Sequence, residues 1–231
     1  MQYVAYSVLR DKVLADLGLE QETFITPSEL IGYCNEGIAE AEQEIHTLYE
    51  DYYLTKAVIN IVAGQSDYAL PTNIYANKIR AVIYKRGTTV TTVARYRNST
   101  RFEDMEIDEI NGPVGDIFKY VLVNDSATGG MILRLIPTPN QNITSGLTIW
   151  YLRAANKISA VTDLCDIPQF SNFVIQYMKV RCYEKEGNPA YDSATARLEM
   201  FRKTMINTLS NKVPDDDDTI IKDMSFYWEH N

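Results

Sequence analysis

The sequence predicts an α+β fold: an antiparallel helical bundle with an inserted antiparallel β-sheet domain, sandwich- or barrel-like, and an extended C-terminal tail. Apolar residues recur every three or four positions near both ends of the chain, which is the helical period. Between them, about a hundred residues show a period of two or short apolar runs, which is typical of strands. Since a two-helix unit buries little apolar surface alone, we expect the two helical pairs to pack together. The strand-rich segment is then an insertion between the second and third helices.

Residues 1–53 are expected to form the first half of the bundle. One helical stripe ends at a glycine and consists of Tyr6, Leu9, Val13 and Leu17. The run Thr26-Pro27-Ser28-Glu29 predicts the start of a second helix, because Thr26 can cap it, Pro27 suits its first turn and Glu29 can complete a capping box. Its apolar stripe consists of Cys34, Ile38, Ala41, Ile45 and Leu48. We therefore expect a long amphipathic helix from roughly Pro27 to Asp51.

Residues 54–160 are expected to form the β domain. Two hairpins are predicted: Lys56–Val62 with Asp67–Leu70, and Lys78–Lys85 with Thr88–Val93 around Arg86-Gly87. A short helix is expected over Thr100–Ile110. Further strands are predicted at Ile117–Val123, Met131–Ile136 and Leu147–Arg153. Pro71, Pro137 and Pro139 each come just after a strand, where the missing N–H ends the ladder.

Residues 161–213 are expected to form the second half of the bundle. Helical spacing returns in Phe170, Phe173, Val174, Tyr177 and Met178, and Gly187 closes this helix. The pair Asn188-Pro189 predicts the start of the last helix. Its stripe consists of Tyr191, Ala194, Leu198, Phe201, Met205 and Leu209, and Val213-Pro214 ends it.

Residues 214–231 are expected to form an extended C-terminal arm. Four like charges, Asp215–Asp218, repel one another and favour a solvated spacer. The apolar and aromatic residues beyond them are too short a segment to form a core, and aromatic residues are enriched at interfaces. We therefore expect a partner-binding role, on the portal or a neighbouring copy, for Ile220, Ile221, Met224, Phe226, Tyr227 and Trp228. The alternative is that these residues fold back onto the chain's own sheet.

Composition excludes several classes of protein. The net charge is −9, which argues against a sequence-independent grip on nucleic acid, because such binding needs a clustered basic face. It does not exclude DNA passing near an acidic surface. Since no run of about 18 apolar residues is present, we expect no membrane association.

The sequence offers no catalytic, cofactor or metal site. His46 and His230 have no Cys or Ser nucleophile near them in sequence, and the spacing of Cys34, Cys165 and Cys182 matches no zinc pattern. The acidic run 103–109 lacks the glycine of a calcium loop, and no glycine-rich phosphate loop is present. We therefore expect a protein that is not an enzyme and has no cofactor.

Several segments, taken in order, resemble one known family. They are the helix Ser28–Tyr49, the run VAGQSDYALP at 62–71, LRLIPTP at 133–139, IWYLR at 149–153, and Ile167-Pro168 before a helix ending in YEKE at 183–186. Together they resemble the head-to-tail adaptor proteins of tailed bacteriophages, also called connector or head-completion proteins. The resemblance covers most of the chain from about residue 26 to 210.

The resemblance implies a structural virion protein without enzymatic activity, located at the neck between capsid and tail and assembled in the host cytoplasm. It implies a homo-oligomeric ring, commonly a dodecamer, that binds below the portal protein. Such a ring continues the DNA channel, through which double-stranded DNA passes without specific binding, and offers a docking platform for tail or nozzle proteins. Two alternatives stay open: another phage neck or tail-completion protein, and an enzyme whose site is scattered in sequence. Oligomeric state separates the adaptor from a free monomer.

Overall fold

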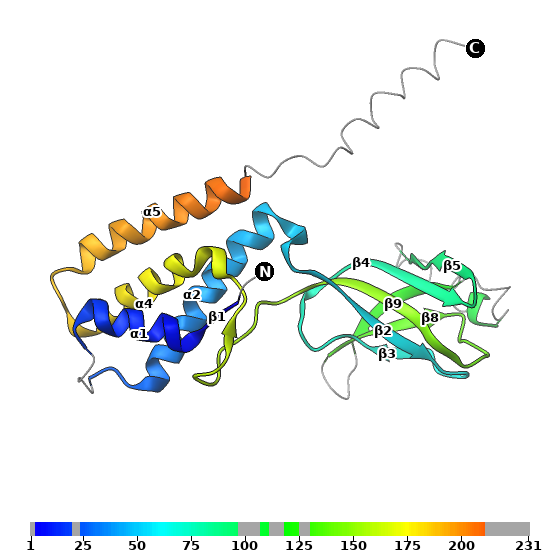
Figure 1. Ribbon diagram of the computed structural model, residues 1–231. Helices are drawn as coiled ribbons and strands as arrows, with labels where there is room; N and C mark the ends of the chain where they lie inside the picture. Colours follow the sequence, from blue (N-terminus) through cyan, green and yellow to red (C-terminus); the bar gives the residue numbers. More distant parts are fainter. Residues whose placement is uncertain (1–2, 20–23, 97–106, 111–117, 125–129, 211–231) are drawn as a thin grey trace, which may run out of the picture. The chain divides into compact units, whose positions relative to one another are not determined.

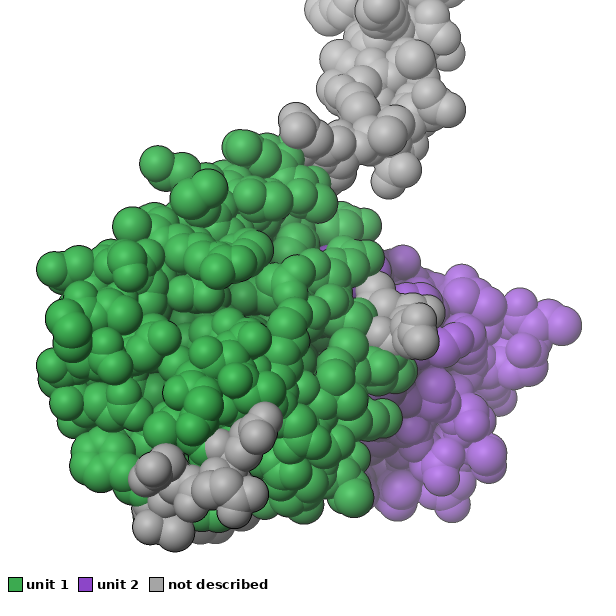
Figure 2. Space-filling view, turned by 60° about the vertical axis from the view of Figure 1, so that its left-hand side comes forward, with its two compact units in different colours: residues 1–49, 155–231 green, residues 50–154 purple. Residues whose placement is uncertain are grey.

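The computed structural model divides the chain into two compact units, coloured separately in Figure 2. The helical unit consists of residues 1–49 and 155–231, and the β unit consists of residues 50–154. The structure describes residues 3–19, 24–96, 107–110, 118–124 and 130–210. The mixed α+β class is confirmed. The predicted segment boundaries stay predictions, and the arm at 214–231 lies outside the described residues.

The helical unit is built around α4. Its helices are α1 (Tyr6–Leu17), α2 (Pro27–Leu48), α4 (Ser171–Glu186) and α5 (Tyr191–Ser210). A short antiparallel pair, β1 (Val4–Ala5) with β10 (Leu164–Cys165), and the 3₁₀ turn η2 (Pro168–Phe170) complete it. Helix α4 packs against α1, α2 and α5 (Figure 1). Because α4 has neighbours on three sides, it is buried around most of its circumference, including Phe173, Val174, Met178 and Cys182.

The predicted start of α2 is confirmed, whereas its predicted end is wrong. Thr26 Oγ1 accepts a hydrogen bond from the Glu29 backbone N–H at 3.3 Å, and the Glu29 carboxylate accepts one from the Thr26 backbone N–H at 2.8 Å. These two bonds form the capping box. The helix ends at Leu48 rather than Asp51, because residues 50–53 form a separate 3₁₀ turn, η1 (Glu50–Tyr53), that belongs to the β unit. Leu48 is consequently half-buried, while Ile45 is fully buried.

The β unit contains two four-stranded sheets. In the first sheet the order is β2 (Leu54–Ile61), β9 (Ile143–Arg153), β4 (Ile74–Arg86) and β5 (Thr89–Thr92), with antiparallel pairing throughout. In the second it is β3 (Asp67–Ala69), β8 (Met131–Ile136), β7 (Lys119–Asn124) and β6 (Ala94–Arg95). Only the short β6–β7 pair among these is parallel. Apolar side chains from both sheets form one core, including Ile61, Tyr84, Leu133, Leu135 and Ile149. The sheets therefore form a sandwich and not a closed barrel.

One of the two predicted hairpins is wrong. The chain crosses from one sheet to the other between β2 and β3, so that β2 pairs with β9 and β3 pairs with β8. The Gly64 N–H donates to the Pro139 carbonyl at 2.7 Å, and the Leu135 N–H donates to the Ser66 carbonyl at 2.9 Å. Arg134 on β8 also holds Asp67 on β3 through two bonds, at 2.6 and 2.8 Å. These contacts attach the turn to the second sheet. The other predicted hairpin, β4 with β5, is confirmed.

Candidate functional site

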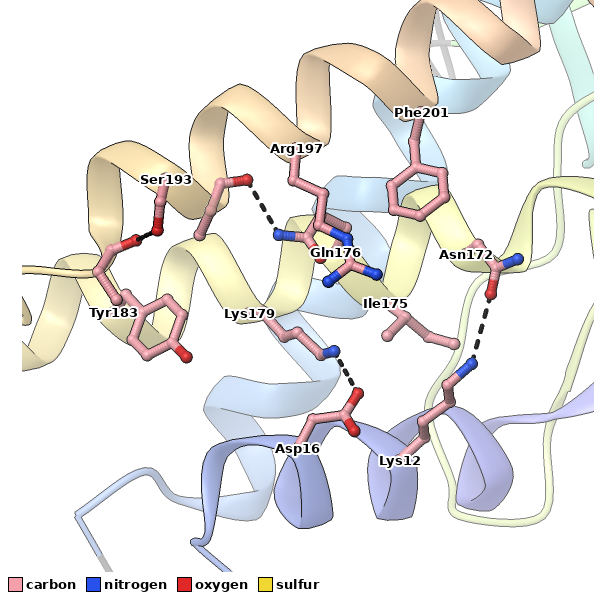
Figure 3. Close-up of a pocket in the computed structure, with 12 residues that line it drawn as sticks. Lys12, Asp16, Asn172, Ile175, Gln176, Lys179, Tyr183, Ser193, Arg197 and Phe201 are labelled. Carbon is pink, nitrogen blue, oxygen red and sulfur yellow. Dashed lines mark hydrogen bonds and ion pairs between the residues drawn. The ribbon is translucent and has the colours of Figure 1, made fainter.

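An open groove of about 500 Å³ runs along α4 between α1 and α5 (Figure 3). We call it the α4 groove. Its polar lining comes from α1 with Lys12 and Asp16, from α4 with Gln176 and Lys179, and from α5 with Arg197. Phe201 adds an aromatic surface near one end. The groove exists because α4 packs against both flanking helices while its remaining face carries side chains of mixed polarity.

The floor of the α4 groove is held by a buried amide. Gln176 is only 4% exposed, and its Nε2 donates to the Ala194 carbonyl of α5 at 2.9 Å. A buried polar group needs such a partner, because leaving it unpaired costs roughly 1–3 kcal/mol. The bond ties α4 to α5, and the neighbouring Ile175 is buried beside it. The groove therefore has a fixed floor.

The charges of the α4 groove do not balance. Lys179 pairs with Asp16, and this hydrogen bond is the largest cause that lowers the pKa of Asp16. Lys12 Nζ lies 3.4 Å from the Asn172 side-chain oxygen, and the Arg197 guanidinium lies 5.7 Å from the centre of the Phe201 ring. Among the described residues, neither Lys12 nor Arg197 has a carboxylate within 4 Å. Three cations against one carboxylate leave a surplus of two positive charges, in a chain whose net charge is −9.

In the β unit, several surface cations have carboxylate partners. Arg80 contacts Glu50 at 2.7 Å and Asp51 at 2.9 Å. Lys119 contacts Asp108 at 2.7 Å. Partial neutralisation of this kind leaves little attraction for a charged ligand.

The edges of the first sheet are also exposed surfaces. Strands β2 and β5 lie at its two ends, and Val58 and Val90 on them are 53% and 62% exposed. An edge strand presents unpaired backbone groups that can pair with another chain. These edges are suited to contacts with other proteins rather than to chemistry.

Among the described residues, the cysteines and His46 are buried. All three cysteines are free and buried. Burial raises the pKa of Cys34 and Cys182 to about 12 and that of Cys165 to about 11, so the thiols are protonated at neutral pH. His46 is buried, with Nε2 lying 3.8 Å from the Glu42 carboxylate. Within the described ranges, no cluster of three His, Cys, Asp or Glu side chains could hold a metal ion.

A family model decides what kind of protein this is. The model of the SU10 adaptor protein matches residues 4–220, almost the whole chain. The chain belongs to the SU10 adaptor protein family. This confirms the resemblance to phage head-to-tail adaptors and makes the protein a structural adaptor of a bacteriophage virion, located at its neck. A search of curated proteins found no match. Among the described helices of this adaptor, none is long and apolar enough to cross a membrane.

The predicted partner-binding residues of the adaptor lie outside the described residues. They are Ile220, Ile221, Met224, Phe226, Tyr227 and Trp228, and their role stays a prediction. Of the acidic run 103–109, only residues 107–109 are described, and Asp108 there accepts hydrogen bonds from Lys119 and Tyr96. That carboxylate is therefore structural in this unit.

Sequence reasoning missed the α4 groove. The available signal was the second stripe on α4, with Asn172, Gln176, Lys179 and Tyr183 at spacings of three and four. The apolar stripe on the same helix predicts the core, whereas a polar stripe alone predicts only a solvated face. The surplus charge of the groove depends on which residues of α1 and α5 face that stripe, which the spacing within α4 does not specify.

Proposed function

We propose that this adaptor forms a homo-oligomeric ring, commonly of twelve copies, that binds below the portal protein of the capsid. The ring continues the DNA channel and provides the platform on which tail or nozzle proteins dock. The match to the adaptor family over residues 4–220 is the observation that carries this proposal. Assembly takes place in the host cytoplasm, before the neck is complete.

The acidity of the chain supports the proposed passage of DNA. A net charge of −9 favours an acidic channel wall, and such a wall repels phosphates. Such a wall also avoids the counterion release that makes basic surfaces hold DNA. Double-stranded DNA therefore passes through the ring without specific binding.

The C-terminal arm, residues 214–231, is proposed to contact the portal. Its apolar and aromatic end includes Phe226, Tyr227 and Trp228. Tyrosine and tryptophan are enriched at interface hot spots, where a large ring is buried and its polar atom can still bond. The spacer Asp215–Asp218 separates this end from the helical unit.

The proposed ring structure is testable by electron microscopy of the purified adaptor, imaged alone and with purified portal. We expect rings coaxial with the portal, and symmetry averaging gives the copy number. The same images distinguish this role from that of another neck or tail-completion protein, which would contact a different component. A protein that stays monomeric with portal at every salt concentration contradicts the proposal.

A further inference from the structure

We propose that the α4 groove binds the acidic segment Asp215–Asp218 of a neighbouring copy in the ring. This inference rests on the proposed ring and specifies how one copy holds the next. It assigns the groove an occupant from the chain itself. The segment lies directly upstream of the aromatic end of the arm, which remains available for the portal.

The charges of the groove and of the segment are complementary. Lys12 and Arg197 line the groove with no carboxylate within 4 Å among the described residues. The segment offers four consecutive carboxylates. An arginine fork can bind a carboxylate through two parallel hydrogen bonds, which gives such a contact direction as well as charge.

Two aromatic side chains at opposite ends of the groove suit the residues that come after the aspartates. Phe201 and Tyr183 line the groove on α5 and α4 (Figure 3). In the arm, Ile220 and Ile221 stand two and three positions after Asp218. A segment that places its carboxylates on Lys12 and Arg197 can therefore also cover apolar surface, which adds stabilisation of about 25 cal/mol per Å².

Chain length limits how one copy could fill its own groove. Arg197 lies 13 residues before Ser210, the last residue of α5, a distance of roughly 20 Å at 1.5 Å per residue. Asp215 is five residues beyond Ser210, so the extended chain covers at most roughly 18 Å. The Cα of the first aspartate therefore falls just short of the Cα of Arg197 in its own copy. Asp218, eight residues beyond Ser210, spans at most roughly 29 Å and could reach Arg197 only if the chain reversed and ran straight back along α5. A neighbouring copy imposes no such limit.

The geometry of such a contact also suits a ring. An arm on one copy and a groove on the next are different surfaces, and a contact of this heterologous kind closes into a ring when the rotation permits. It also counters repulsion between acidic copies. Residues 211–231 contain two lysines and six acidic residues, a net charge of −4, and they would meet a surplus of +2 in the groove.

Site-specific disulfide formation tests the proposal in the full-length adaptor. One preparation carries Ser193→Cys in the groove lining, and a second, distinguished by size, carries Asp217→Cys in the arm. The two are mixed under assembly conditions and mildly oxidised. The three natural cysteines are buried, so the introduced cysteines are the ones expected to react. We expect a disulfide that joins a copy from the first preparation to a copy from the second. Adding Arg197→Glu to the first preparation should lower the yield of this disulfide about tenfold, because a negative charge then faces the aspartates. Adding Arg197→Lys keeps the positive charge and should preserve the yield of the disulfide.

The control replaces Ser193→Cys with Glu199→Cys, which lies on α5 and is exposed but does not line the groove. The inference is overturned if rings form normally but the disulfide yield with Ser193→Cys is no higher than the yield with Glu199→Cys. The proposed function is then left intact. A second test uses one chain that carries both Ser193→Cys and Asp217→Cys, oxidised at high dilution. An intramolecular disulfide in this chain also overturns the inference, because the groove is then occupied by the arm of the same copy. If microscopy shows no rings with portal, the proposed function fails first and this contact with it.

Discussion

The α4 groove and the paired cations of the β unit differ in how their charges are balanced. In the β unit, Arg80, Lys119 and Arg134 each contact a carboxylate. The helical unit has comparable pairs, with Arg181 on Glu36 at 3.0 Å and Lys185 on Glu29 at 2.7 Å. The α4 groove departs from this pattern, because Lys12 contacts an amide and Arg197 an aromatic ring, and neither has a carboxylate within 4 Å among the described residues. The groove therefore carries a surplus of positive charge on a chain that is acidic as a whole.

The two units also differ in how the chain builds them. The β unit is one continuous segment, 50–154, whereas the helical unit needs both ends of the chain. Each has its own apolar core, with Leu133 and Ile149 in the first and Ile45 and Val174 in the second. Two separate cores predict two separable contributions to stability.

Removal of the arm has the largest expected effect. A chain ending at Val213 should lose portal binding in a pull-down assay, while the melting temperatures of both units stay unchanged. The physical reason is that the arm contributes interface rather than core. A clear fall in melting temperature would instead show that the aromatic residues pack on their own chain. Full portal binding by the shortened chain would contradict the role proposed for the arm.

Core substitutions should separate the two units. Leu133→Ala and Ile45→Ala each remove a side chain with no exposed surface, and each should cost about 2–5 kcal/mol in the free energy of unfolding. Differential scanning calorimetry should show Leu133→Ala lowering the transition of the β unit and Ile45→Ala lowering that of the helical unit. An equal shift of a single transition by both variants would show that the units unfold together.

Loss of the cap on α2 should have a smaller effect. Thr26→Ala removes the hydroxyl that accepts a hydrogen bond from the Glu29 N–H at 3.3 Å and should cost about 1 kcal/mol. Chemical denaturation measures this cost, and Thr26→Ser is the matched control because it keeps the hydroxyl. If Thr26→Ala lowers the free energy of unfolding as much as Ile45→Ala does, then Thr26 stabilises the fold by more than this one hydrogen bond.

In the β unit, the pair that attaches β3 to β8 should matter less. Asp67→Asn removes the charge that binds Arg134, but both side chains are about 40% exposed, so the cost should not exceed roughly 1 kcal/mol. Urea denaturation at low and high salt measures this cost. The difference in the free energy of unfolding between the wild type and the variant should shrink at high salt, because salt screens the ion pair. An advantage independent of salt would indicate a packing role for Asp67.

The smallest expected effect is a dependence on pH. The hydrogen bond from Lys185, followed by those from Thr26, lowers the pKa of Glu29 from 4.5 to about 2. A lowered pKa in the folded state stabilises the fold above the unfolded value and loses that stabilisation as pH falls. The difference in melting temperature between wild type and Glu29→Gln should therefore narrow between pH 4.5 and about 2. A constant difference across this window would contradict the assignment.

The sequence predicted the features that depend on near neighbours in the chain. The capping box at Thr26, the turn between β4 and β5, and β8 at Met131–Ile136 all result from local spacing, and all are present. The pairing of β3 was missed because it depends on Arg134, which is 67 residues from Asp67. The α4 groove was missed for the same reason, since its charge sums side chains from three helices. Sequence periods indicate which face of a helix is buried, and they do not indicate which charges face one another.

The three buried thiols have a consequence for the working life of the particle. Cys34, Cys165 and Cys182 lie in the helical unit, fully shielded, and burial raises the pKa of each thiol far above neutrality. Oxidants react with the exposed thiolate, so shielded, protonated thiols react slowly. A virion leaves the reducing interior of its host and persists in air-saturated surroundings. Chemical ageing of this adaptor should therefore begin at exposed methionines, with Met200 at 68% exposure the first among the described residues.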